Sequence, residues 1–135
     1  VITSQLKDKD IEHPGISKLK VVSTMHERKS LMYKFSDGFI ALPGGTGTME
    51  EFFEIFTWAQ LGLHRKPCGI LNICHYYDKL LEFMDHAVSQ RFLKHAHRSA
   101  ILVDENPESL LEKFETYRPP LIDKWMDKET KNSFV

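Results

Sequence analysis

The stretch "FIALPGGTGTMEEFFEIF", residues 39–56, decides the fold of this chain, because it runs from an apolar segment through three glycines into an acidic, aromatic-rich helix. The run "GFIAL" at 38–42 is short and continuously apolar, which is typical of a parallel strand buried on both faces. The helix after the turn is predicted over about 49–61, since Gly62 is a suitable C-terminal cap and Pro67 prevents continuation. A strand, a turn and a helix in this order predict a crossover in an α/β protein.

The same order repeats along the rest of the chain. Apolar segments at 67–73 and 100–103 predict two more buried strands, and a helix is expected over about 76–91. Asn106 and Pro107 form a strong helix start before the last apolar stripe, which reaches Tyr117. Upstream, a helix is expected over 23–36 with Ser23 or Thr24 as its cap, and residues 3–20 are predicted to be a loop. Strands that alternate with helices predict a parallel sheet with right-handed crossovers and a ligand site at the carboxyl ends of the strands.

Size and composition bound the remaining possibilities. A chain of 135 residues is expected to form one domain, over about 1–118, followed by a charged tail at 119–135. The net charge of −1 gives no reason to expect nucleic acid or a membrane surface as a partner. Cys68 and Cys74 fall in one predicted strand, too far apart for a disulfide, and two unpaired cysteines suit a reducing cytoplasm. The chain begins with "VIT" rather than Met, which is typical of the end of a buried strand, so an N-terminal part of the fold is expected to be missing.

The glycine-rich loop has the chemistry of an anion site. Gly44, Gly45 and Gly47 let backbone N–H groups approach a ligand, with positive φ where the turn needs it, and the next helix directs its positive end to the same place. Thr46 and Thr48 add hydroxyl donors. The loop matches neither of the two common nucleotide-binding motifs. It lacks the Lys of GxxxxGK(S/T), and its glycine spacing is not GxGxxG. A phosphate site is the favoured interpretation, and a tight turn without a ligand is the alternative.

Two carboxylates follow the loop directly, and a phosphate would repel them. One interpretation is structural: Thr48 and Glu51 match a capping box, in which the glutamate returns to the helix start. The other is functional: a carboxylate turned toward the sugar of a nucleotide would stabilise an oxocarbenium ion at its anomeric carbon. Glu50 points about 100° away from Glu51 around a helix, so only one of them is expected to face the sugar. Helical geometry leaves that choice open.

The segment "MHERK" at 25–29 is a second charged group. Such a run is most often a solvated helix face. In a functional interpretation, Arg28 and Lys29 supply cations for a phosphate or a purine near the same sheet edge.

Together, "MHERK" and "SDGFIALPGGTGTMEEFFEIFTWAQLGLHRKPCGILN" resemble the LOG (Lonely Guy) family of cytokinin riboside 5′-monophosphate phosphoribohydrolases, long labelled as lysine decarboxylases. The family motif PGGxGTxxE is met in full, from Pro43 to Glu51. The resemblance implies a Rossmann-like homodimer, or a higher homo-oligomer, that splits adenosine-type 5′-monophosphates such as AMP into free base and ribose 5-phosphate. It places the catalytic pair on Arg28 and Glu51. It places nucleotide contacts on Glu12, Lys29, Gly44, Gly45, Thr46, Gly47, Thr48 and Glu50.

The resemblance also implies what the chain lacks and what it does not need. Family members carry an N-terminal strand and a second glycine-rich loop upstream of residue 1. The hydrolysis is expected to need no cofactor and no metal, and the histidines lack ligand spacing, with His95 and His97 a lone pair. Two alternatives remain: a nucleotide-binding module without turnover, and a decarboxylase, which would need pyridoxal phosphate on a lysine. The sequence does not choose between adenine and a prenylated adenine as the base.

Overall fold

A computed structural model describes residues 1–7 and 15–120 of the chain. It divides into two compact units, Val1–Asp37 and Gly38–Val135, which are described separately below. Glu12, most of the "HPG" turn at 13–15 and the charged tail from residue 121 onward lie outside the described residues.

The first unit is built on a two-stranded parallel sheet. Strand β1 (Ile2–Thr3) pairs with β2 (Val21–Val22), with Ile2 opposite Val21 and Thr3 opposite Val22. Both residues of β1 are buried, which confirms that "VIT" belongs to a buried strand. A short helix α1 (Ser4–Lys7) follows, so the prediction of a loop throughout 3–20 is wrong at this point.

Helix α2 (Met25–Phe35) begins where the sequence predicts, with Thr24 as its N-cap. The Thr24 hydroxyl accepts the Glu27 N–H at 3.1 Å, and the Glu27 carboxylate accepts the N–H groups of Ser23 and Thr24 at 2.8 and 3.2 Å. This reciprocal arrangement is a capping box, which satisfies N–H groups that the helix leaves without an internal partner. Glu27 is therefore structural, and "MHERK" is more than a solvated face.

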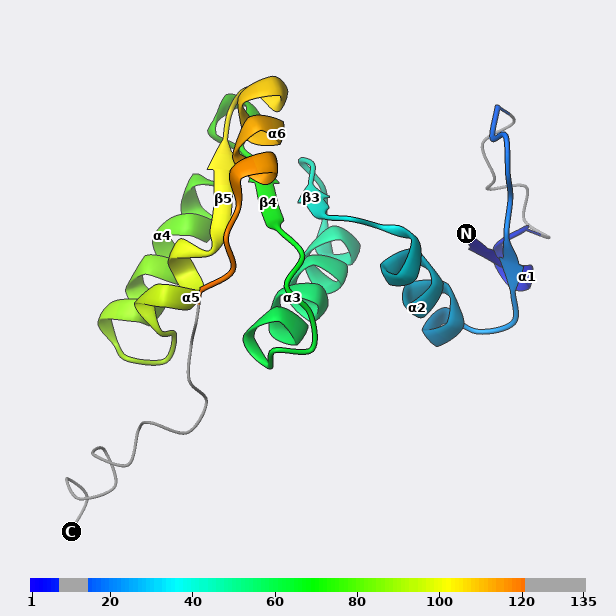
Figure 1. The fold of residues 1–135 in the computed structure, drawn as a ribbon, viewed down its shortest axis with the longest axis horizontal. Helices are drawn as coiled ribbons and strands as arrows, with labels where there is room; N and C mark the ends of the chain where they lie inside the picture. The colour runs from blue at the N-terminus through cyan, green and yellow to red at the C-terminus, as the bar shows by residue number, and fades with distance from the viewer. Residues whose placement is uncertain (8–14, 121–135) are drawn as a thin grey trace, which may run out of the picture. The chain divides into compact units, whose positions relative to one another are not determined.

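The second unit contains a three-stranded parallel sheet in the order β3-β4-β5, with helices around it (Figure 1), which confirms the α/β class. Each strand except the last is followed by a crossover that returns the chain to the same end of the sheet. The elements in chain order are β3 (Phe39–Ala41), α3 (Thr46–Gln60), β4 (Cys68–Leu71), the 3₁₀ turn η1 (Ile73–His75), α4 (Asp78–Ser89), α5 (His95–Ser99), β5 (Ile101–Asp104) and α6 (Pro107–Thr116).

The core of this unit lies between the sheet and helices α3 and α6. All four residues of β4 are buried, as expected for the central strand of a parallel sheet. Helix α3 buries Phe52, Ile55 and Phe56, and α6 buries Leu110 completely. Phe114 lies directly on Gly69, where a Cβ atom would approach its ring to 2.6 Å. Glycine at this position therefore lets helix α6 reach the sheet.

Strand β3 differs from the prediction, because it is not buried on both faces. Ile40 is 38% exposed, whereas its neighbour Ala41 is buried. The register pairs Ile40 with Gly69, so Ile40 lies on the face of the sheet that α6 covers. Helix α6 packs on β4 and β5 but not closely on β3, which is the edge strand on the opposite side of β4 from β5. Ile40 and Leu42 consequently line an apolar hollow beside Leu110.

The remaining elements differ in part from the sequence predictions. Helix α3 begins at Thr46, three residues before the predicted start, and β4 ends at Leu71, so Cys74 lies in the η1 turn and not in a strand with Cys68. Helix α5 was not predicted, since its five residues carry no apolar period. Two predictions are confirmed: Gly62 follows α3 with φ of +69°, and the Asn106 side chain caps α6 by accepting a backbone N–H.

Candidate functional site

The glycine-rich loop lies at the carboxyl edge of the three-stranded sheet. Because the strands are parallel, the segments that follow Ala41, Leu71 and Asp104 all leave the sheet at the same edge. These segments are the glycine loop, the η1 turn and the residues before α6. Ligands of open α/β sheets bind outside this edge, so the loop is in the position that the sequence predicts.

The three glycines of the loop serve two different purposes. A Cβ atom at Gly44 would lie 2.2 Å from Thr48 Oγ1, so glycine is required there for the loop to close on the helix. At Gly45 and Gly47 an added Cβ would meet nothing within 4 Å. These two positions therefore present backbone to open space, as an anion cradle requires. None of the three has a positive φ, so close approach of the backbone is the reason for glycine here.

The start of α3 excludes the capping-box interpretation of Glu51. The N-cap is Gly45, which has no side chain to accept a hydrogen bond, and Thr48 is already the third helical residue. Glu51 is the sixth residue of the helix, well inside it, and does not cap its first turn. The first N–H groups of α3 are left to be satisfied by water or by a ligand, which favours an anion at this helix end.

Glu51 and Glu50 differ in their surroundings. Glu51 is half-buried, whereas Glu50 is exposed. Thr48 and Glu51 are three residues apart on α3, so they are neighbours on one helix face, and Thr48 is the residue that packs against Gly44. Glu51 therefore lies on the side of the helix that carries the closed end of the loop.

Two tyrosines hold the glycine loop, and the sequence analysis did not find them. The Tyr76 hydroxyl donates to the Gly44 carbonyl at 2.9 Å, and the Tyr77 hydroxyl donates to the Leu42 carbonyl at 2.5 Å. The two rings pack edge to face, with their centroids 4.8 Å apart. The sequence signal was a pair of adjacent tyrosines just after a buried strand, but only the sheet brings them to a loop more than 30 positions earlier.

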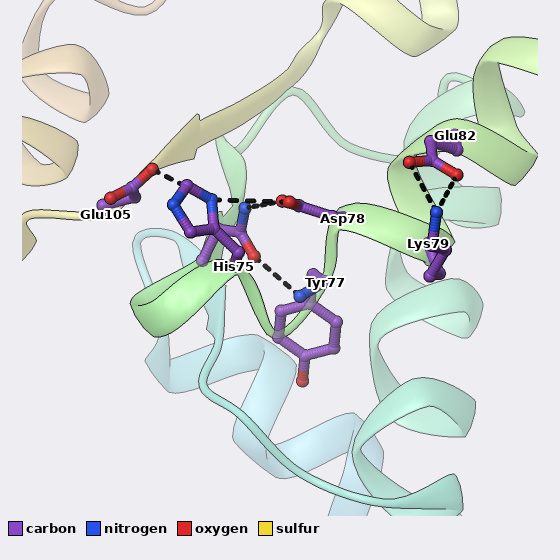
Figure 2. Close-up of polar contacts among 7 residues, drawn as sticks. His75, Tyr77, Asp78, Lys79, Glu82 and Glu105 are labelled. Carbon is purple, nitrogen blue, oxygen red and sulfur yellow. Dashed lines mark hydrogen bonds and ion pairs between the residues drawn. The ribbon is translucent and has the colours of Figure 1, made fainter.

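The backbone before the tyrosines is held by polar contacts, of which those of Asn72 are the more buried (Figure 2). The side chain of Asn72, which is 4% exposed, accepts the Tyr77 N–H at 2.6 Å and donates to Asp78 at 2.7 Å. Its backbone N–H donates to the Asp104 carbonyl of β5 at 2.7 Å. In Figure 2 the His75 ring lies between Asp78 and Glu105, with Nδ1 at 3.4 Å from an oxygen of each. The turn is therefore tied both to β5 and to the start of α4.

Burial also sets the chemistry of the tyrosine pair. Tyr77 is 3% exposed, and this burial raises the pKa of its hydroxyl above the ordinary value. The Tyr77 hydroxyl therefore stays protonated at neutral pH and remains a hydrogen-bond donor to the loop. Tyr76 is 55% exposed, so solvent reaches its ring.

Apart from Glu12, which lies outside the described residues, the remaining predicted site residues lie in the other unit. Arg28 and Lys29 lie on α2 of the unit Val1–Asp37, both half-buried. The Arg28 guanidinium donates from Nε to the Val1 carbonyl at 3.3 Å and contacts the Met25 sulfur at 3.6 Å. The structure therefore brings the loop residues from Gly44 to Glu51 together, while the pairing of Arg28 with Glu51 stays a prediction.

Residues 1–7 and 15–120 contain neither a candidate metal site nor a membrane-spanning helix. Within these ranges no three His, Cys, Asp or Glu side chains gather in a way that could hold a metal ion. No helix of the described residues has the length and apolar content needed to cross a bilayer.

These features define the class: an α/β protein with a parallel sheet and an open glycine-rich loop at its carboxyl edge. The chain belongs to the family described as "Possible lysine decarboxylase", whose model matches residues 1–114, and this confirms the resemblance to the LOG family. The chain is 46% identical over 119 residues to the "Probable cytokinin riboside 5′-monophosphate phosphoribohydrolase LOGL2" of Oryza sativa subsp. japonica. It is 45% identical over 119 residues to the cytokinin riboside 5′-monophosphate phosphoribohydrolase LOG7 of Arabidopsis thaliana.

These alignments cover 88% of this chain but only 49% and 55% of the two relatives. The chain thus spans about half the length of the curated relatives it matches.

Proposed function

We propose that this protein hydrolyses the N-glycosidic bond of adenosine-type 5′-monophosphates, including cytokinin riboside 5′-monophosphates, and releases the free base and ribose 5-phosphate. The names of its relatives support this reaction class. The observation that carries the proposal is the pairing of an open glycine loop at Gly45 and Gly47 with the half-buried carboxylate of Glu51, one turn behind Thr48.

This arrangement resolves the conflict between a phosphate and a carboxylate. In the proposed complex the 5′-phosphate lies at the N–H groups of the loop, and the sugar extends along the helix toward Glu51. The rise from Thr46 to Glu51 is roughly 7–8 Å by helix geometry, a length that a ribose 5-phosphate can bridge. The negative end of the ligand then meets the positive helix end, and the carboxylate meets the carbon where positive charge develops.

The chemistry is a hydrolysis that balances without a further reactant. The bond between C1′ and the purine nitrogen breaks, and its electron pair leaves with the base. Glu51 stabilises the oxocarbenium-like state or orients the water that attacks C1′, and the proton lost by this water ends on the departing base. Arg28 is proposed to anchor the nucleotide and to assist departure of the purine. Lys29, Glu12, Thr46 and Glu50 are proposed as further nucleotide contacts.

The test is an incubation with AMP and with a prenylated AMP, followed by chromatography of the products. Glu51→Gln keeps the shape of the side chain but removes its charge, so turnover should fall by roughly 10²–10⁴-fold while the unfolding temperature stays close to that of the wild type. Glu54→Gln, one turn further along the same helix and without a proposed role in the site, is the matched control and should retain most of the turnover. Wild-type turnover in Glu51→Gln would refute the assigned role.

Two other activities are outcomes of the same experiment. Tight binding of AMP without release of base would favour a nucleotide-binding module. The description of the family suggests a decarboxylase, and carbon dioxide released from lysine after addition of pyridoxal phosphate would support that activity instead.

The oligomeric state and the compartment are likewise proposed and not shown. A homodimer or a higher homo-oligomer is expected from the resemblance, and sedimentation equilibrium of the purified protein would test it. A monomer at micromolar concentration would contradict it. The expected cytoplasmic location can be tested by cell fractionation.

A further inference from the structure

Two tyrosines that follow β4 contact the glycine loop through their hydroxyl groups. Tyr76 reaches the Gly44 carbonyl, and Tyr77 reaches the Leu42 carbonyl, so two hydroxyl groups hold the loop on both sides of Pro43. Neither is needed for the sheet itself, since the strands end at Ala41 and Leu71. The contacts therefore bear on the shape of the loop.

The Tyr76 contact sets the direction of one amide of the loop. In a planar trans peptide the carbonyl of Gly44 and the N–H of Gly45 point in opposite directions. A hydroxyl that holds the Gly44 carbonyl therefore turns the Gly45 N–H away from the tyrosine. Gly45 is the N-cap of α3, and the space beside it is open. The N–H that Tyr76 orients is thus one of those that an anion would use.

The turn that presents the tyrosines has an uncommon backbone. Cys74 and His75 both have positive φ, 52° and 59°, which is rarely adopted by residues other than glycine and is unfavourable for them. The surroundings hold this conformation: Asn72 binds the Tyr77 N–H, and His75 lies between Asp78 and Glu105 (Figure 2). Strained backbone that persists at the edge of a ligand site is associated with positioning.

We propose that Tyr76 is a positioning residue for the phosphate end of the ligand, and that Tyr77 anchors the base of the same loop. Tyr76 acts through the Gly44–Gly45 peptide and presets the Gly45 N–H toward the open side of the loop. Tyr77 fixes the chain where it leaves β3. The assignment of the ligand as a nucleoside 5′-monophosphate rests on the proposed function, whereas the effect on anion binding does not.

The two hydroxyl groups are expected to differ in what their removal changes. Tyr76 is 55% exposed, so in Tyr76→Phe water can reach the Gly44 carbonyl and the unfolding temperature should stay the same. The loop loses its preset orientation, and KM for AMP and Kd for inorganic phosphate should both rise roughly 2- to 10-fold, the range of one neutral hydrogen bond. Because the phosphate is bound equally in substrate and transition state, kcat should change less than twofold.

Tyr77 is 3% exposed, so Tyr77→Phe should lower the unfolding temperature as well as weaken phosphate binding. Tyr117→Phe is the matched control, since Tyr117 follows α6 and takes no part in the loop. It should leave KM, Kd and kcat at wild-type values.

The experiment combines AMP kinetics, calorimetric titration with inorganic phosphate, and NMR of glycine-labelled protein. A change in the Gly45 amide signal in Tyr76→Phe, together with the higher KM and phosphate Kd, supports the proposal. Wild-type values of KM and phosphate Kd in this variant, or loss of folding, would overturn it. If the wild type binds phosphate but releases no base from AMP, the proposed function fails, while the phosphate titration still decides the role of Tyr76.

Discussion

Substitution of Gly47 by alanine tests whether glycine occupies the start of α3 because of its backbone conformation or because a ligand needs the space beside it. Gly47 is the second residue of α3, its φ is not positive, and an added Cβ would meet no atom within 4 Å. Alanine therefore fits the native backbone and reduces the freedom of the unfolded chain. Gly47→Ala should raise the free energy of unfolding by about 0.4–1 kcal/mol, or by roughly 2–8 °C in unfolding temperature for a unit of this size.

The same methyl group would occupy the space that a phosphate needs. Forcing a methyl group against a packed neighbour costs about 1–3 kcal/mol, so phosphate binding should weaken roughly 5- to 150-fold. The assay is thermal unfolding of wild type and variant by calorimetry, followed by titration of both with inorganic phosphate and with AMP. A more stable protein with weaker binding is the expected result.

The control lies at the other end of the same helix. Gly62 also has open space around it, but its φ is +69°. Gly62→Ala should lower the free energy of unfolding by about 1–2 kcal/mol, because alanine disfavours the left-handed region, and it should leave phosphate binding unchanged. A loss of stability in Gly47→Ala would refute the helix start described above. Unchanged phosphate and AMP binding in that variant would refute the ligand site.

Two further predictions concern groups outside the site. Burial raises the pKa of Cys68 to about 12, whereas Cys74 is exposed. Titration of the native protein with Ellman's reagent should therefore show one fast thiol, which is lost in Cys74→Ser, and one thiol that reacts only after unfolding. Two fast thiols would contradict the burial of β4. Burial, followed by the nearby charge of Lys94, lowers the pKa of His97 below its ordinary value of 6.5, so the unfolded chain binds more protons than the folded one as the pH falls below that value. The contribution of His97 to the free energy of unfolding should therefore be complete above pH 6.5 and decline below it. Urea midpoints measured at several pH values should show a smaller decline in His97→Gln than in the wild type. An equal decline in both proteins would contradict this prediction.

The elements that local sequence determines were predicted well. The strands at β4 and β5 follow from continuous apolar runs, and the start of α6 follows from Asn106 and Pro107, because a cap satisfies backbone groups within a few residues of itself. The position of the glycine loop at a strand's carboxyl end follows in the same way. The sequence also predicts close approach of the loop backbone, since this requires only that glycine has no side chain.

The tertiary structure alone decided how the loop is closed and which residues hold it. The Thr48–Glu51 pattern also fitted a capping box, but α3 begins at Thr46 with Gly45 as its N-cap, which leaves both residues inside the helix. Ile40 is exposed because α6 covers only the neighbouring strands. Tyr76 meets Gly44 through the pairing of β3 with β4, and no local pattern contains a contact across 32 positions. Hydrogen bonds between distant segments depend on strand order and register, and these arise only when the sheet assembles.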